Sequence, residues 1–167
     1  MQITAVATAA GPMGACLGTS NPWRCLSMEE ARTLEAICER VIPADQDPGA
    51  AWAGAVVFID QQLAGPYRRL RKTYQWGLSA TNQTSLARFG RLFAELAPQQ
   101  QDTVLESMDT GQARGEYWKP VSAKAFFDLV VNHTKQGFYG DPRHGGNRQR
   151  VSWKMLHLPY PPVRGRQ

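Results

Sequence analysis

Residues 26–43 read LSMEEARTLEAICERVIP and contain the signals for the start, the buried face and the end of one helix. Ser27 and Glu30 have the spacing of a capping box, in which each side chain accepts a hydrogen bond from the backbone amide of the other residue. Apolar residues then recur at helical spacing. Pro43 ends the pattern because the residue before a proline is pushed out of the helical region. This stretch therefore predicts a helix from Ser27 to about Val41.

The same patterns predict five more helices along the chain. Their expected ranges are Ala50–Leu63, Tyr67–Ala80, Ser85–Leu96, Pro98–Met108 and Ser122–Gln136. No stretch shows the period-two alternation of a half-buried strand. After Gly137 glycine and proline are frequent, and about 30 residues show no regular pattern, which is uncommon in a compact domain unless the segment is functional. We expect an all-α protein: a compact bundle of five to six helices with a long irregular C-terminal segment.

The expected helical domain covers residues 26–159, between an N-terminal segment (1–25) and a C-terminal tail (160–167). Residues 3–19, ITAVATAAGPMGACLGT, are uncharged and mainly small and apolar. This composition resembles the later part of an export signal, but the basic start of such a signal is missing. A twin-arginine leader that lacks its start, a degenerate leader and a disordered tail all remain open. The stretch is too short and too weakly apolar for a transmembrane helix.

The formal net charge of +5 is unevenly distributed. Residues 61–94 hold six basic residues and no acidic one, and the chain is basic again from Lys135 to its end. Such stretches suit nucleic acid, anionic lipid or an acidic protein surface, or simply form a solvated, mildly basic surface. The aromatic residues between Tyr67 and Trp76 are explained by packing at least as well as by stacking on bases. No nucleic-acid partner is expected.

No phosphate loop, dinucleotide fingerprint, haem attachment site or serine nucleophile motif is present. Cys16, Cys25 and Cys38 are spaced by 9 and 13 residues, which matches no zinc pattern. We expect Cys38 to be a buried small hydrophobic residue. No catalytic, cofactor-binding or metal-binding residue is assigned. The alternative is a free-standing periplasmic metal-dependent enzyme or metal protein, with His133, Asp141 and His144 converging on the metal.

Residues 137–159, GFYGDPRHGGNRQRVSWKMLHLP, combine aromatic residues, arginines and glycines. Exposed aromatic and arginine side chains are enriched at protein–protein hot spots. A loop that wraps its own domain is the structural alternative, and the two are compatible. The predicted partner interface consists of Phe138, Tyr139, Asp141, Arg143, His144, Asn147 and Trp153.

Three stretches together resemble the gluconate 2-dehydrogenase subunit 3 family. They are LSMEEARTLEAICERVIPADQDPGAAWAGAVVFIDQQLAGPY (Leu26–Tyr67), RLFAELAPQQQDTVLESMD (Arg91–Asp109) and AFFDLVVNHTKQGFYGDPRHGGNRQRVSWKMLHLP (Ala125–Pro159). Within the last stretch, GFYGDPRHGGN is the most specific element. The resemblance covers almost the whole chain except its two ends.

The resemblance implies a non-catalytic small (gamma) subunit of a periplasmic dehydrogenase complex at the inner membrane. In such complexes a large flavoprotein of the glucose-methanol-choline type binds FAD and oxidises a sugar or sugar acid, and a multihaem cytochrome c with haem c often takes the electrons. The small subunit is expected to bind no cofactor itself and to support folding and twin-arginine export of the flavoprotein. Members usually carry a twin-arginine leader, and no arginine pair precedes Trp23 here.

Overall fold

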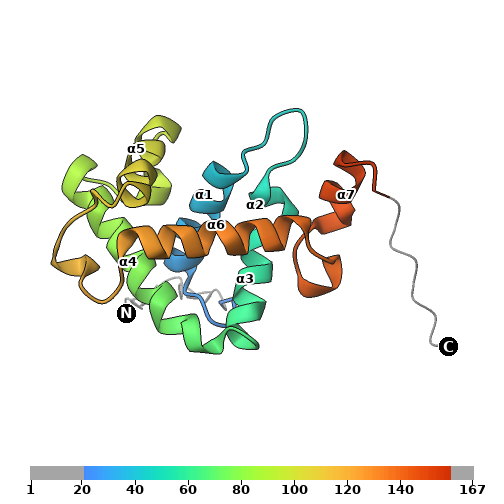
Figure 1. Cartoon of the computed structure of the whole chain (residues 1–167), viewed down its shortest axis with the longest axis horizontal. Coiled ribbons are helices and arrows are strands. Elements are labelled where there is room, and N and C mark those ends of the chain that lie inside the picture. Colours follow the sequence, from blue (N-terminus) through green and yellow to red (C-terminus); the bar gives the residue numbers. More distant parts are fainter. Residues whose placement is uncertain (1–20, 159–167) are drawn as a thin grey trace, which may run out of the picture.

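The computed structural model describes residues 21–158, and this part of the chain contains helices and no strand (Figure 1). Its α-helices are α1 (Met28–Val41), α2 (Ala50–Ala53), α3 (Ala55–Ala64), α4 (Arg71–Phe89), α5 (Pro98–Asp109), α6 (Ala123–Tyr139) and α7 (Val151–Met155). Short 3-10 helices are η1 (Arg68–Leu70), η2 (Phe93–Glu95), η3 (Glu116–Trp118), η4 (Pro142–His144) and η5 (Arg148–Arg150). The all-α prediction is confirmed. The leader-like residues 1–20 and the tail from residue 159 lie outside the described residues.

Helix α6 crosses the whole molecule, and the other long helices pack around it (Figure 1). Its most extensive neighbour is α3, and α1, α4 and α5 also contact it. Within residues 21–158 no helix has the length and apolar character needed to cross a bilayer.

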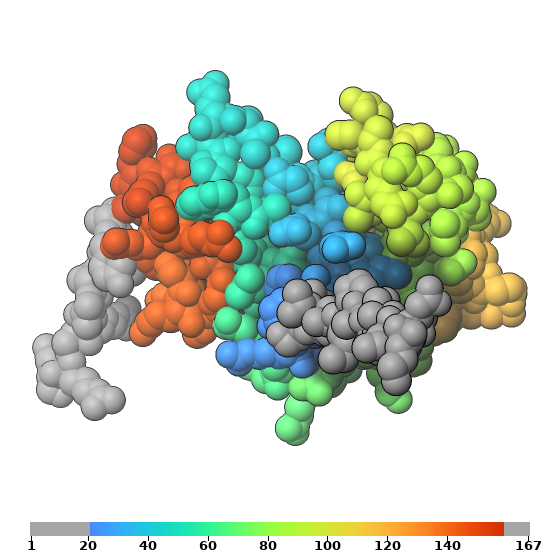
Figure 2. Space-filling model, turned by 180° about the vertical axis from the view of Figure 1, so that it is seen from behind, coloured from blue at the N-terminus to red at the C-terminus, as the bar shows by residue number. Residues whose placement is uncertain are grey.

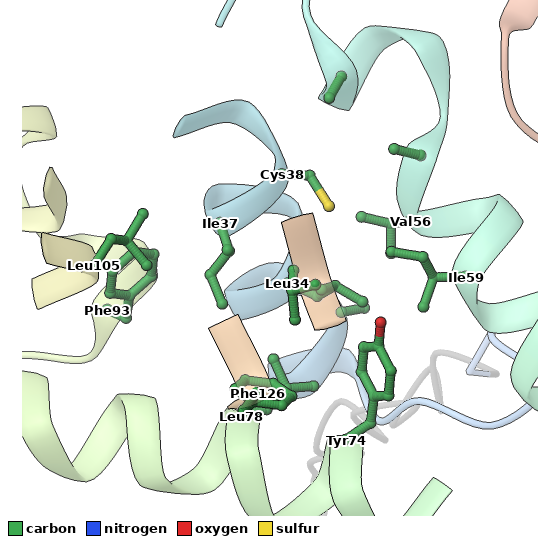
Figure 3. Close-up of a cluster of buried hydrophobic side chains, with 14 of the residues drawn as sticks. Leu34, Ile37, Cys38, Val56, Ile59, Tyr74, Leu78, Phe93, Leu105 and Phe126 are labelled. Atoms are coloured by element: carbon green, nitrogen blue, oxygen red, sulfur yellow. The ribbon is translucent and has the colours of Figure 1, made fainter. Parts of the chain in front are cut away.

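Helix α1 is as predicted at both ends. The Glu30 amide donates to Ser27 Oγ at 3.1 Å, and the Ser27 amide donates to Glu30 Oε2 at 2.7 Å, which completes the capping box. Leu34, Ile37 and Cys38 are fully buried and contribute to the core shown in Figure 3. Each of the two larger aliphatic side chains contributes about 1.5 to 3 kcal/mol by leaving water. The expectation that Cys38 is a buried hydrophobic residue is confirmed.

The predicted helix Ala50–Leu63 is interrupted at Gly54. This residue has φ +78°, a left-handed conformation that favours glycine, and it separates α2 from α3. A Cβ atom on Gly54 would lie 3.3 Å from the carbonyl oxygen of Gly145, so the C-terminal part of the chain approaches this break closely.

The prediction of separate helices at Tyr67–Ala80 and Ser85–Leu96 is wrong. One helix, α4, runs from Arg71 to Phe89 and ends at Gly90, whose φ is +70°. Polar side chains near its middle bond back to the preceding turn: Thr81 Oγ1 donates to the Gly77 carbonyl at 2.8 Å and Thr84 Oγ1 to the Ala80 carbonyl at 2.9 Å. These bonds let α4 pass through a polar stretch while it remains buried.

The end of the incorrectly predicted helix Ser85–Leu96 instead forms η2. The Phe93 amide donates to Oδ1 of the buried Asn82 at 3.2 Å, so a side chain of α4 fixes this turn. Phe93 is fully buried and reaches the core from η2 (Figure 3).

Helices α4 and α6 come together at Gly77. A Cβ atom on Gly77 would lie 2.3 Å from the ring of Phe126, which real structures do not allow. The absence of a side chain therefore lets the Phe126 ring lie directly on the α4 backbone. Tyr74 meets the same ring edge-on at a centroid distance of 5.7 Å.

Asp60 on α3 holds the segment that precedes α1. Its carboxylate is 3% exposed and accepts hydrogen bonds from three consecutive backbone amides, those of Arg24 (2.8 Å), Cys25 (2.9 Å) and Leu26 (3.1 Å). Buried charge is tolerated when several donors satisfy it. We refer to this arrangement as the Asp60 clamp.

Candidate protein interface

Residues 140–158 are not irregular throughout, in contrast to the sequence prediction. They form η4, η5 and α7 and fold back against α2, α3 and α6. Figure 2 shows this segment, in orange to red, lying against the cyan region of α2 and α3. We call residues 140–158 the C-terminal hook.

Two features hold the hook in place: a close backbone contact at a glycine, and the side-chain hydrogen bonds of a buried asparagine. A Cβ atom on Gly146 would lie 2.0 Å from the carbonyl oxygen of Gly137, so the hook backbone rests directly on α6. Asn147 is fully buried with φ +46°; its Nδ2 donates to the Gly140 carbonyl at 2.9 Å, and its Oδ1 accepts from the Ser152 amide at 3.0 Å. The Asn147 side chain thus joins the start of the hook to α7.

Two residues of the predicted interface face inward. Phe138 is 1% exposed and belongs to the core, and Asn147 is fully buried. Their side chains are occupied by the chain's own packing, so we correct the predicted interface by removing both. These two residues fold the hook, and the interface role of the remaining residues stays a prediction.

Asp141 and Arg143 bind each other. Asp141 begins η4 and accepts from the Arg143 amide at 3.0 Å, while the Arg143 guanidinium donates to Asp141 Oδ2 at 2.7 Å and 3.0 Å. The hydrogen bonds from the Arg143 side chain lower the pKa of Asp141, helped by the bond from the amide. His144 is exposed in the same turn. This pair therefore shapes η4, and its role toward a partner stays a prediction.

The exposed end of the molecule carries large apolar side chains. Tyr139 is 43% exposed, Trp52 40% and Leu156 49%. Trp153 is half-buried, and its Nε1 donates to the Tyr139 carbonyl at 2.9 Å. The Arg148 guanidinium lies over the Trp52 ring, 5.8 Å from its centroid, in a cation–π contact. We call Trp52, Tyr139, Arg148, Trp153 and Leu156 the aromatic end surface.

Trp52 was missed by the sequence analysis because it lies about 90 residues before the other aromatic residues of this surface. The available signal was a tryptophan among alanines (AAWA) in a segment too short to bury it. A groove of about 370 Å³ adjoins the surface, where Pro43 and Asp45 face Lys135, Tyr139 and Met155.

Backbone strain is concentrated in the same place. Asn147, Gln149 and Arg150 have φ values of +46°, +54° and +60°. A left-handed conformation is unfavourable for residues other than glycine, least so for asparagine, and persists where the surrounding structure enforces it. Such strain clusters at binding and switch regions. Here it positions Arg148 over Trp52.

A larger groove, of about 700 Å³, shares no residue with the aromatic end surface. It lies over α1 and η2, and its lining combines charged side chains such as Glu29, Arg32 and Glu35 with apolar ones such as Met28 and Leu92. The charged side chains are those expected on the solvated face of an amphipathic helix.

The metal-site alternative is not supported by the geometry. Within residues 21–158 no group of three or more His, Cys, Asp or Glu residues is placed to hold a metal ion, so His133, Asp141 and His144 do not form one. His133 is buried and stacks on Tyr67 at a centroid distance of 4.6 Å, and its Nδ1 lies 2.8 Å from the hydroxyl of Tyr74. Burial lowers the pKa of His133.

The fold and the aromatic end surface define a small all-α protein that suits the binding of another protein. Residues 28–159 match the family model described as gluconate 2-dehydrogenase subunit 3, and the chain belongs to this family. It is thus an accessory subunit of a dehydrogenase complex. The comparison with curated proteins gave no match, and neither did the comparison with solved structures.

Proposed function

We propose that this chain binds the FAD-carrying subunit of a periplasmic sugar or sugar-acid dehydrogenase and stabilises it through the aromatic end surface. The observation that supports this most is the exposure of Trp52, under Arg148, and of Tyr139, bonded to Trp153. Tryptophan, tyrosine and arginine are the residue types that dominate binding energy at protein interfaces. Substrate oxidation belongs to the flavoprotein, and a cytochrome c takes its electrons.

Preorganisation supports the same proposal. Gly146 seats the hook on the backbone of α6, and Asn147 bonds within the hook to Gly140 and Ser152, so the aromatic end surface exists before a partner arrives. A surface that needs little ordering loses less entropy on binding. A partner that binds only the folded flavoprotein stabilises it by mass action, which aids its folding before export and at the membrane.

The proposal is tested by co-expressing the flavoprotein with variants of this chain. Trp52→Ala combined with Tyr139→Ala should weaken binding by at least tenfold, since each hot-spot residue is worth about 2 kcal/mol. Met28→Ala is the matched control, because Met28 is 42% exposed and lies on α1 outside the aromatic end surface. The measurements are the yield of soluble, FAD-loaded dehydrogenase and the affinity of the purified pair.

If deletion of this chain leaves the yield of FAD-loaded dehydrogenase unchanged, the proposed role is refuted. If the chain is required but the double variant binds as tightly as Met28→Ala, the role survives and the assignment to the aromatic end surface does not.

A further inference from the structure

Helix α4 presents a second surface that the proposed function does not use. Its exposed residues recur every three or four positions and therefore share one side of the helix. Between the exposed arginines Arg71 and Arg88, they are Lys72, Gln75, Trp76, Ser79, Gln83, Leu86 and Ala87, which we call the α4 stripe. Trp76 is 46% exposed and Leu86 38% exposed. Neither residue belongs to the aromatic end surface.

The α4 stripe is unusual because it lacks charge beyond its first residue. No charged residue occurs from Thr73 to Ala87. By contrast, the exposed side of α1 carries Glu29, Arg32 and Glu35. An exposed helix face in water normally carries charged residues. Depletion of charge together with an aromatic residue is the compositional mark of the centre of a protein–protein interface.

Positive charge borders the stripe, most strongly at the start of α4. Arg68, Arg69 and Lys72 are exposed, and none of them forms an ion pair with a carboxylate of residues 21–158. The first turn of α4 contains no acidic residue, so these cations also face the positive end of the helix dipole. Like charges are thus concentrated where they oppose helix formation.

The far end of the stripe is also basic but less so. Arg88 lies 5.5 Å from the centre of the Phe89 ring, and Arg91 lies 3.9 Å from Glu95. The two ends of the α4 stripe, Lys72 and Ala87, are about 22 Å apart along the helix, at 1.5 Å per residue. A partner that fits should place its carboxylates opposite Arg68, Arg69 and Lys72.

We propose that the α4 stripe is a docking face for an acidic surface of another protein. A second copy of the chain fits poorly, because antiparallel pairing of α4 would bring Lys72 against Arg88, and parallel pairing would bring Lys72 against Lys72. A lipid surface also fits poorly, since Gln75, Ser79 and Gln83 interrupt the apolar face that an interfacial helix buries. A protein surface with carboxylates beside an apolar patch complements both the basic start of the α4 stripe and its uncharged remainder.

The test uses the native complex purified from membranes and the isolated full-length chain. Zero-length carbodiimide coupling joins a lysine amine to a carboxylate in direct contact. We expect Lys72 to be coupled to an Asp or Glu of another subunit, and Trp76 to be oxidised by hydroxyl radicals at least fivefold more slowly in the complex than in the free chain. If Trp76 is equally reactive in both and Lys72 forms no bond to another protein, the proposal is overturned.

Two further measurements test the two other possible occupants of the stripe, a lipid surface and a second copy of the chain. Protection of Trp76 that appears only with vesicles containing anionic phospholipid would assign the stripe to lipid and overturn the proposal. Protection in the isolated chain that rises with its concentration would assign the stripe to a second copy, with the same consequence. The docking variant is Gln83→Arg, which places a charge in the stripe on an exposed helical position, and Trp52→Ala serves as the comparison.

The two docking proposals can fail separately. Gln83→Arg should reduce the carbodiimide coupling of Lys72 to another subunit at least tenfold. Trp52→Ala should instead lower the yield of FAD-loaded dehydrogenase. Loss of the Trp52→Ala effect would refute the aromatic end surface and leave the α4 stripe intact.

Discussion

Replacement of Gly146 by alanine should detach the C-terminal hook from α6. The new Cβ atom would lie 2.0 Å from the Gly137 carbonyl oxygen, 2.8 Å from the carbonyl carbon and 3.0 Å from Cα. All three atoms belong to the backbone of a helix and cannot rotate away. Gly146 and its neighbour Asn147 must therefore retreat by about 1 Å, while Gly140 stays bonded to the Gln136 carbonyl at the end of α6, which is enough to break the contact of Asn147 with the Gly140 carbonyl.

The expected loss of stability is about 3 to 5 kcal/mol. Overpacking of a close contact costs about 1 to 3 kcal/mol. The two hydrogen bonds of the buried Asn147 side chain contribute about 1 kcal/mol each when both are lost. Urea unfolding followed by circular dichroism measures this loss, and limited trypsin digestion reports faster cleavage at Arg148 and Arg150.

Gly90→Ala is the matched control. A Cβ atom on Gly90 meets nothing within 4 Å, but its φ is +70°. It should therefore cost about 1 kcal/mol from the left-handed backbone alone and leave cleavage in the hook unchanged. If Gly146→Ala unfolds at the same urea concentration as the parent and is cleaved no faster, the account of the hook is incorrect.

Three other predictions concern buried polar groups. The free energy of unfolding should fall as pH drops from 7.5 to 5.5, because burial lowers the pKa of His133 and the unfolded chain, with an ordinary pKa near 6.5, then binds the proton more readily. Thermal melts of the parent and His133→Gln test this, and equal pH slopes would contradict it. Asp60→Ala should destabilise the fold by about 3 kcal/mol, since the three backbone amides of Arg24, Cys25 and Leu26 lose their acceptor. Asp60→Asn should cost less, and urea unfolding that ranks the two variants otherwise would disprove the clamp. Burial raises the pKa of Cys38 to about 12, so iodoacetamide at pH 8 should modify Cys38 only in unfolded protein. The less buried Cys25 should react earlier. Peptide mapping that finds modified Cys38 in the native protein would count against this.

The sequence predicted α1, α5 and α6 well because their signals are local. The Ser27 capping box, Pro98 at the start of α5 and Ser122 before α6 all act within one turn of the residues that they organise. The sequence prediction ended one helix at Ala80 and began the next at Ser85, on either side of the polar residues 81–84, whereas α4 runs through them. The hydrogen bonds of Thr81 and Thr84 to the preceding turn and the packing of Phe126 on Gly77 depend on the tertiary structure, which no local pattern reveals.

The partner interface stays a prediction, and the structure bears only on which of its residues are exposed. The motif after Gly137 contains both side chains that fold the hook and side chains that lie on its surface. Composition alone cannot separate Asn147, which is buried, from Arg148, which lies over Trp52. That separation depends on the close approach of Gly146 to α6, a contact between backbones.

The Asp60 clamp also determines how the chain responds to mechanical force. A pull on the chain ahead of Asn21 meets the hydrogen bonds of Arg24, Cys25 and Leu26 with Asp60 before it reaches the capping box of α1. Load then passes directly into α3, which packs along α6, and not into the first turn of α1. The start of α1 is thereby shielded from unravelling under tension.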